Sequence, residues 1–97
     1  MATVTHSFIL EMDTNTPNWP EGNISAARAS GVIVSETETV ITNSDSDYVN
    51  GKYRTRIVRV FRSLEDKENF EAEALASTAR QAFVTTYHVR RINEVIS

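Results

Sequence analysis

The sequence predicts an α+β domain in which two helices cover one face of a four-stranded antiparallel sheet. Segments in which apolar and polar residues alternate occur four times, and segments with helical spacing occur twice between them, in the order β-α-β-β-α-β. The chain has 97 residues, of which 40% are apolar and 24% are charged. This length and composition are typical of one globular domain, so residues 1–97 are expected to form a single unit.

The first strand is predicted over Thr3–Met12, because its side chains alternate in character. The face expected to point toward the helices carries Val4, His6, Phe8, Leu10 and Met12. The next segment, Asp13–Asn23, holds both prolines, a glycine and several Asn and Thr residues, which is typical of a loop.

The first helix is predicted to begin between Trp19 and Asn23 and to end at Ser30. Pro20 suits a first helical turn, and Gly31 is a natural residue just beyond a helix end. A helix is therefore expected to separate the first strand from the second.

The next two strands, Gly31–Thr42 and Lys52–Arg62, are predicted to form a hairpin whose arms carry opposite charge. The first arm holds Glu36 and Glu38, the second holds five bases, and an Asn-Gly dipeptide that favours a tight turn stands at 50–51. Opposite charges on neighbouring strands stabilise a ladder by roughly 0.2–1 kcal/mol per pair, so we expect acid–base pairs across this hairpin.

A long second helix is predicted to begin at Ser63, which stands three residues before Asp66 in a capping pattern. Phe70 falls on its polar side, so we expect Phe70 to be exposed or covered from outside the core. The last strand is predicted over Thr86–Ile96, which is rich in β-branched residues. The helix face expected to be buried carries Ala72, Leu75, Ala76, Ala79, Ala82 and Phe83.

Charge is divided unevenly along the chain. Residues 1–51 hold one base and seven acids, a net charge of −6, whereas residues 52–97 hold nine bases and six acids, a net charge of +3. The two halves are therefore expected to contact each other, within one chain or across a dimer. The overall charge of −3 disfavours a protein that works mainly by gripping phosphate backbones.

Composition and motifs exclude several classes of site. The chain has no cysteine, which excludes disulfide scaffolds, thiolate metal sites and cysteine nucleophiles. It has no run of about 18 apolar residues and no signal-peptide pattern, so we expect a cytoplasmic protein without membrane contact. Motifs for nucleotide phosphates, nucleophilic serine and zinc are also missing, so no cofactor and no metal site are expected.

The predicted strands carry apolar residues on both faces. Ile9 faces away from Phe8, and Ile57 faces away from Val58. Two helices on one side cover only one face of a sheet. A second copy of the chain, packed sheet to sheet, is therefore predicted to cover the other face and to make the protein a homodimer.

The predicted order of elements is that of the ferredoxin-like split β-α-β fold. Residues 56–70, a basic strand that passes through Ser-Leu-Glu-Asp into an acidic helix start, together with the chain length and element order, resemble the dimeric α/β-barrel superfamily. That superfamily includes small monooxygenases of the antibiotic-biosynthesis type. The resemblance implies a homodimer with a ligand-sized cavity between each sheet and its own helices. It implies no catalytic residue, because the third-strand tryptophan frequent in those oxygenases is missing and Trp19, the only tryptophan, lies in the first loop.

Histidines are the first candidates for catalysis. His6 lies on the inward face of the first strand and His88 on the predicted last strand. If the ends of these strands match, His88 opposes Leu10 and lies roughly 13 Å from His6, too far for one metal ion. His6 either lines a pocket and moves a proton, or is a core histidine bonded to a backbone group or to Tyr87. The candidate catalytic residues are thus His6, Tyr87 and His88.

Large aromatic side chains are the candidate ligand contacts. Trp19 stands between two prolines, where it serves as a pocket lid, a dimer contact or a loop anchor. Phe8 and Tyr53 lie on strands that are expected to border the cavity.

The function that fits these features best is binding or oxidation of a small organic molecule in the cavity, without metal or nucleotide; whether the chain is an enzyme stays open. The alternative is a non-catalytic protein-interaction or assembly module. A third reading is single-stranded RNA binding through Phe8, Tyr53, Arg54 and Arg56, since RNA-recognition modules share this strand order. The acidic strand opposite these bases favours pairing within the hairpin instead.

Overall fold

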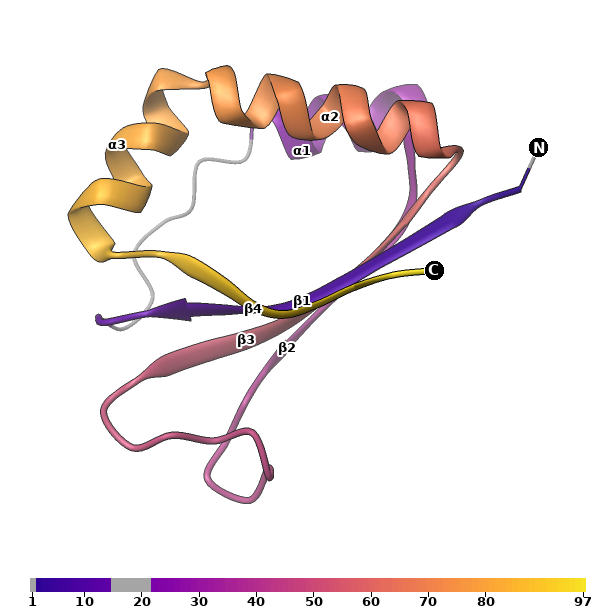
Figure 1. The fold of residues 1–97 in the computed structure, drawn as a ribbon. Coiled ribbons are helices and arrows are strands. Elements are labelled where there is room, and N and C mark those ends of the chain that lie inside the picture. The colour runs from indigo at the N-terminus through magenta and orange to yellow at the C-terminus, as the bar shows by residue number, and fades with distance from the viewer. Residues whose placement is uncertain (1, 15–21) are drawn as a thin grey trace.

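The computed structural model describes residues 2–14 and 22–97 as two layers, a sheet with helices on one of its faces (Figure 1). The strands are β1 (Val4–Met12), β2 (Ile33–Val40), β3 (Tyr53–Phe61) and β4 (Arg90–Ile96). The helices are α1 (Gly22–Ser30), α2 (Leu64–Ala76) and α3 (Thr78–Tyr87). The predicted α+β class with a four-stranded antiparallel sheet is confirmed, with one helix more than expected.

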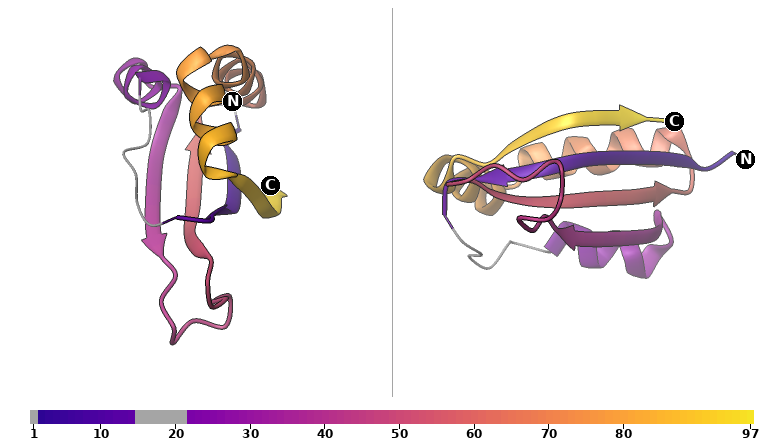
Figure 2. Two further views of the ribbon diagram at one scale, coloured as in Figure 1. Left: turned by 90° about the vertical axis from the view of Figure 1, so that its left-hand side faces the viewer. Right: turned by 90° about the horizontal axis from the view of Figure 1, so that it is seen from below.

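The sheet has the strand order β2-β3-β1-β4, and every neighbouring pair is antiparallel. Figure 2 shows the strands side by side from below, with the helices behind them. The first and last strands are neighbours, as the sequence predicts. The first three strands begin and end within two residues of their predicted bounds, because alternation marks the first and β-branched residues with loop and turn residues at their ends mark the other two.

Alternation along β1 places apolar side chains on both faces of the sheet. Phe8 and Leu10 point toward the helices, where they line a cavity. Ile9 and Glu11 therefore point to the opposite face. Phe8 is 3% exposed and Ile9 is 4% exposed, so this central strand is shielded on both sides.

The main apolar core lies between the sheet and the first two helices. Phe61 on β3 is fully buried, and its ring centroid lies 5.4 Å from that of Phe70 on α2. Figure 2 shows α1 over the β2 side of the sheet and the other two helices over the opposite side. The core therefore fastens α1 and α2 to the sheet through one cluster, formed by Ile24, Ala27, Ile33, Phe61 and Phe70.

The predicted buried face of the second helix is wrong except at Phe83, which is buried in α3. Phe70 and Ala74 are the buried residues of α2, whereas Leu75 is 61% exposed. The alanines at 72 and 76 are exposed as well. Burial of one phenylalanine ring removes more apolar surface from water than burial of an alanine methyl group. The orientation of α2 therefore buries Phe70 and leaves the alanines exposed.

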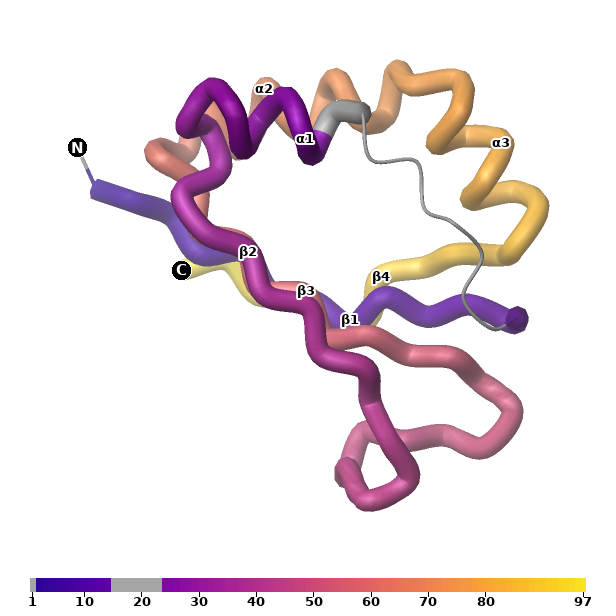
Figure 3. The backbone as a smooth tube through the Cα atoms, turned by 180° about the vertical axis from the view of Figure 1, so that it is seen from behind, coloured from indigo at the N-terminus to yellow at the C-terminus, as the bar shows by residue number. Residues whose placement is uncertain are grey.

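The long predicted helix is in fact two helices. Ser63 caps α2 as predicted, since its Oγ accepts a hydrogen bond from the backbone N–H of Asp66 at 3.1 Å. Ser77 then adopts an extended backbone conformation, and its Oγ accepts from the N–H of Arg80 at 3.3 Å. A serine that caps a helix start competes with continued helix, so α2 ends and α3 begins in a new direction (Figure 3).

The predicted start of the last strand is wrong too. Tyr87 ends α3, and His88 follows it with a left-handed backbone, φ 54. The His88 N–H donates to the carbonyl of Val84, which closes the helix end. The strand begins only at Arg90, because the left-handed residue first redirects the chain toward the sheet.

The hairpin between β2 and β3 carries one of the expected cross-strand pairs. Glu36 lies opposite Arg59, and their side chains form an ion pair with both partners 6% exposed. Arg54 and Arg56 pair instead with acids of β1 and of the β2–β3 loop: Glu11, Asp45 and Asp47. The acidic half and the basic half thus contact each other within one chain, as predicted.

We expect two truncations on α2 to separate the buried face from the exposed one. Phe70→Ala should lower the free energy of unfolding by about 3–5 kcal/mol, because it opens a cavity against Phe61. Leu75→Ala should change it by less than about 0.5 kcal/mol, since an exposed side chain loses little. Urea unfolding followed by circular dichroism measures both. Equal losses would contradict the observed orientation of α2.

Candidate functional site

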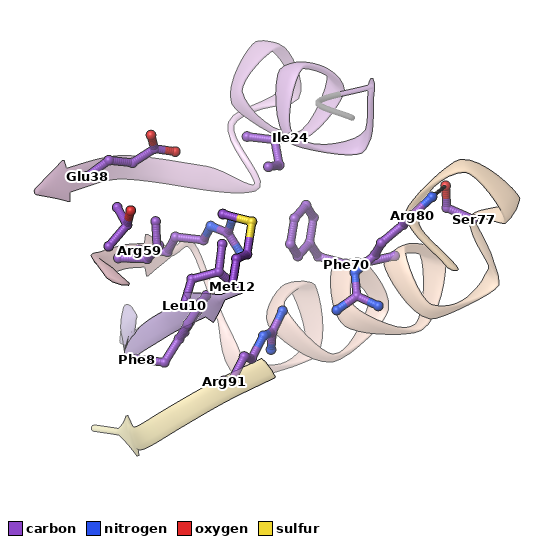
Figure 4. A pocket seen from close by; sticks show the side chains of 13 residues that line it. Phe8, Leu10, Met12, Ile24, Glu38, Arg59, Phe70, Ser77, Arg80 and Arg91 are labelled. Atoms are coloured by element: carbon purple, nitrogen blue, oxygen red, sulfur yellow. Dashed lines mark hydrogen bonds between the residues drawn. The ribbon is translucent and has the colours of Figure 1, made fainter. Parts of the chain in front are cut away.

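A cavity of about 130 Å³ lies between the sheet and the helices (Figure 4). It is open to solvent on one side. Its position is the one that the sequence resemblance implies, between the sheet and the helices of the same chain. The wall is formed by Phe8, Leu10, Met12, Ile24, Glu38, Thr55, Ile57, Arg59, Phe70, Ala74, Ser77, Arg80 and Arg91.

Aromatic and aliphatic side chains form the floor and part of the roof of the cavity. Phe8 and Ile57, both 3% exposed, come from the central strands β1 and β3. Phe70 and Ala74 come from α2, one turn apart, and Ile24 comes from α1. These elements meet because the alternation of the strands and the stripe of the helices direct their apolar side chains into the same space.

Three arginines interrupt this apolar wall. Arg59 on β3 is 5% exposed, and its Nε donates to Glu36. Its guanidinium carbon lies 5.4 Å from the ring centroid of Phe70 and 5.5 Å from that of Phe8. Arg59 is therefore a buried cation whose charge is balanced by one carboxylate and two aromatic faces.

Arg91 enters the cavity from β4. Its Nη1 donates to Glu71 at 2.9 Å and to Glu94 at 3.4 Å. The guanidinium carbon lies 4.4 Å from the centroid of the Phe8 ring, which is a close cation–π contact. The Nε of Arg91 is buried and has no hydrogen-bond partner among the described residues.

Arg80 enters from the first turn of α3 and, among the described residues, is the cavity arginine without a direct ion pair. Within the residues that the structure describes, its guanidinium makes no hydrogen bond and no ion pair, although its backbone N–H bonds to Ser77. Burial and repulsion by Arg91 hold the pKa of Arg80 below its usual range, against the attraction of Glu71. Figure 4 shows Arg80 and Arg91 approaching the cavity from α3 and β4, on the side away from Glu38.

His6 does not line the cavity but lies behind it in a buried polar cluster. It is 0% exposed, and its Nε2 lies 2.7 Å from the Glu94 carboxylate. Its Nδ1 lies 3.5 Å from Glu71 and makes no hydrogen bond. Burial lowers the pKa of His6, an effect that the two carboxylates oppose and the cations Arg91 and Lys67 reinforce.

Of the two roles expected for His6, a pocket residue that moves a proton or a core histidine, the buried cluster fits the second. It is a core histidine, but its partner is a glutamate on β4 rather than the backbone group or Tyr87 expected from the sequence. Its ring packs against Phe8 and Phe61, at centroid distances of 5.0 and 6.4 Å.

The three candidate catalytic residues do not come together. The expected pairing of Leu10 with His88 is wrong, because Leu10 pairs with Arg91 in β4. His88 lies outside the strand, at the end of α3, and is exposed. Tyr87 packs its ring against Phe83 at 4.7 Å and does not line the cavity.

The three candidate ligand contacts also separate. Phe8 lines the cavity, and its role as a ligand contact stays a prediction. Tyr53 is 43% exposed and lines a different hollow of about 270 Å³ near the β2–β3 hairpin. Trp19 lies outside the described residues.

The residues proposed for RNA stacking do not form one surface. Phe8 lies under the helices and is 3% exposed, so no base has access to its ring. Arg54 pairs with Glu11 at 2.7 Å, and Arg56 pairs with Asp47 at 2.6 Å. Both cations are thus already balanced within the chain.

Sequence reasoning missed the charged part of the cavity wall. Arg59 shares its strand face with Ile57 and Phe61, so the alternation alone marks it as a base on the buried side. The positions of Arg80 and Arg91 depend on the break at Ser77 and on the register of β4, which the sequence pattern does not reveal. Over residues 2–14 and 22–97, no group of three His, Asp or Glu residues is arranged to hold a metal ion.

No protein-family model matches the sequence, and no curated protein is detectably similar to it. Among the helices of the described segments, none has the length and apolarity needed to cross a bilayer. The geometry of the cavity is therefore the basis for the function proposed below.

We expect acid to destabilise the fold through His6. Because the pKa of His6 is lowered in the folded state, the unfolded chain binds a proton that the native chain does not. The stabilisation is complete above the ordinary pKa of about 6.5 and is lost as the pH falls below it. The slope for one proton is at most about 1.4 kcal/mol per pH unit.

Urea unfolding between pH 7 and pH 5 measures this slope. His6→Phe should flatten it in that range. Glu94→Gln should keep it, because an amide oxygen still accepts from Nε2 but no longer carries the charge that favours protonated His6. An unchanged slope in His6→Phe would show that other groups cause the acid sensitivity.

Proposed function

We propose that this chain is a ferredoxin-like protein that binds a small organic molecule in the cavity between its sheet and its helices. The observation that carries the proposal is the cavity itself, about 130 Å³ of space walled by Phe8, Ile57 and Phe70 with charged groups at its edge. A cavity of about 150 Å³ lined by apolar side chains is large enough for benzene. The strand order, with β1 and β3 in the centre, supports the ferredoxin-like assignment.

The proposed function is binding of a small organic molecule, without its oxidation. His6 is sealed behind the cavity, and Tyr87 and His88 lie elsewhere. The wall offers aromatic faces and fixed cations, which recognise and orient a ligand. Of the small-molecule functions found in the dimeric α/β-barrel superfamily, we therefore propose only ligand binding for this chain.

The cavity is tested by filling it. Ala74 lines the cavity at 6% exposure, whereas Ala72 on the same helix is exposed. Ala74→Phe should weaken binding of benzyl alcohol by roughly tenfold or more, because the added ring takes the space that the ligand needs. Ala72→Phe adds the same ring outside the cavity and should leave the affinity unchanged. Titrations followed by NMR chemical shifts give both dissociation constants.

The folded state of each variant is checked by the dispersion of its amide spectrum, since overpacking costs about 1–3 kcal/mol. If benzyl alcohol fails to bind the parent chain, or binds both variants equally, the proposed function is wrong.

We also propose that the chain is a homodimer joined through the face of the sheet that lacks helices. Alternation from the cavity side places the half-buried Val58 and Val60 on this face, beside Ile9, which one chain already shields. Its rim is charged but balanced, because four bases pair there with four acids: Arg54, Arg56, Arg90 and Lys52 with Glu11, Asp13, Asp45 and Asp47. Burial raises the pKa of Glu11, but Arg54 and Arg90 outweigh it and hold that pKa below its usual range. A balanced rim around an apolar centre lets two identical faces approach without net repulsion.

Solution mass tests the dimer. The parent chain should have the mass of two subunits by light scattering. Val58→Glu, on the proposed interface, should shift the protein to the mass of one subunit, because an unpaired acid is costly in an apolar contact. Leu75→Glu makes the same kind of change on an exposed helix face and should leave the dimer intact. A parent chain that stays a monomer at high concentration contradicts the interface.

A further inference from the structure

We propose that the cavity binds a small organic monoanion, a carboxylate on an apolar ring or short chain, and that Arg80 recognises the carboxylate. This inference rests on the proposed binding function and names the chemical class of the ligand. It depends on three features of the cavity, which are its unsatisfied donors, its distribution of charge and the size of its apolar part.

The unsatisfied donors all lie at the α3 end of the cavity. Arg80 has no ion-pair partner in the part of the chain that the structure describes, and the buried Nε of Arg91 has no hydrogen-bond partner there. The buried Nε of Arg91 is unfavourable without an acceptor, and the half-buried guanidinium of Arg80 is a fork that matches the two oxygens of a carboxylate. A bound carboxylate would supply the acceptors that these two arginines lack.

The pattern of ion pairs favours an anion at this end of the cavity. Arg59 pairs with Glu36, and Arg91 pairs with Glu71 and Glu94. Arg80 is the cavity arginine that makes no direct ion pair within the described residues; Glu71 attracts it from a distance, and Arg91 repels it. The first turn of α3, which Ser77 begins beside Arg80, adds the positive end of a helix dipole.

Glu38 sets the direction of the ligand. It lines the cavity from β2, and no ion pair of Glu38 is present in the described segments. Figure 4 shows Glu38 on β2 and Arg80 on α3 on opposite sides of the group of lining residues. A carboxylate is therefore attracted to the α3 end and repelled from the β2 end, so a molecule with acids at both ends is disfavoured.

The apolar part of the ligand is limited to about one ring. The space of about 130 Å³ is bounded by Phe8, Met12 and Phe70. A cavity of about 150 Å³ holds benzene, so one ring that reaches the open edge of this slightly smaller cavity is the largest apolar group that fits, and a fused ring system does not fit. The aromatic faces of Phe8 and Phe70, already close to Arg59, would contact this ring.

The test compares three probes that share one ring and differ in charge: benzoate, benzyl alcohol and benzylamine. We expect benzoate to bind the parent chain about tenfold or more tightly than benzyl alcohol, because hydrogen bonds to a charged group are the stronger ones. Arg80→Gln should reduce the affinity for benzoate by about tenfold and that for benzyl alcohol by much less, because the neutral ligand makes no charged contact with Arg80. NMR titration of amide shifts measures each dissociation constant.

Arg62→Gln is the matched control. It removes the same charge from an exposed arginine that pairs with Asp66 outside the cavity, and it should leave benzoate binding unchanged. Raising the salt concentration should weaken benzoate binding and not benzyl alcohol binding.

The outcomes separate this inference from the function on which it rests. If benzyl alcohol binds in the cavity and benzoate binds no better, or benzylamine binds best, the monoanion is wrong while the proposed function stands. If Arg80→Gln weakens both ligands equally, Arg80 only supports the cavity wall and its assignment is overturned. If no probe binds, the proposed function and the inference fail together.

Discussion

Arg59 imposes the constraint on which the arrangement of this protein depends, because a cation lies beneath the helices where an apolar core is expected. Its charge is balanced by Glu36 on β2, and its guanidinium packs near the rings of Phe8 and Phe70. Leaving either partner of such a buried pair alone costs about 3–5 kcal/mol. The ion pair thus fixes β2 against β3. The contact between the Arg59 guanidinium and the Phe70 ring fixes the position of α2 over the sheet.

The space between the helices and the sheet consequently has two parts, one apolar and one that contains charged side chains. One part is the dry cluster around Phe61 and Phe70, which fastens α1 and α2 to the sheet. The other part combines aromatic rings with Arg59, Arg80 and Arg91 and encloses the cavity. Charged side chains do not pack to the density of an apolar core, because they must keep their hydrogen-bonding atoms satisfied. The space left between them is the candidate binding site.

The break at Ser77 connects this division to function. If α2 continued as one straight helix, Arg80 would lie on the same helix axis as Phe70 and Ala74, beyond the cavity. The serine cap instead starts α3 in a new direction and brings Arg80 to the cavity wall. The left-handed His88 then returns the chain to the sheet, where β4 delivers Arg91 to the same cavity. Two local turns therefore assemble the charged end of the site.

The sequence by itself determined the order of the strands along the chain, the bounds of the first three, the cap at Ser63 and the cavity-facing position of Phe8. These features follow from neighbouring residues, through alternation and capping, so a single segment contains the necessary information. Only the tertiary structure decided which face of α2 is buried, where the last strand begins, what bonds to His6, and which arginine lacks a partner. Each of these depends on competition between groups far apart in the chain: the Phe70 ring against an alanine stripe, and three arginines against the acids within their reach. Such competition is resolved by the free energy of packing and ion pairing in the folded chain, which no local pattern contains.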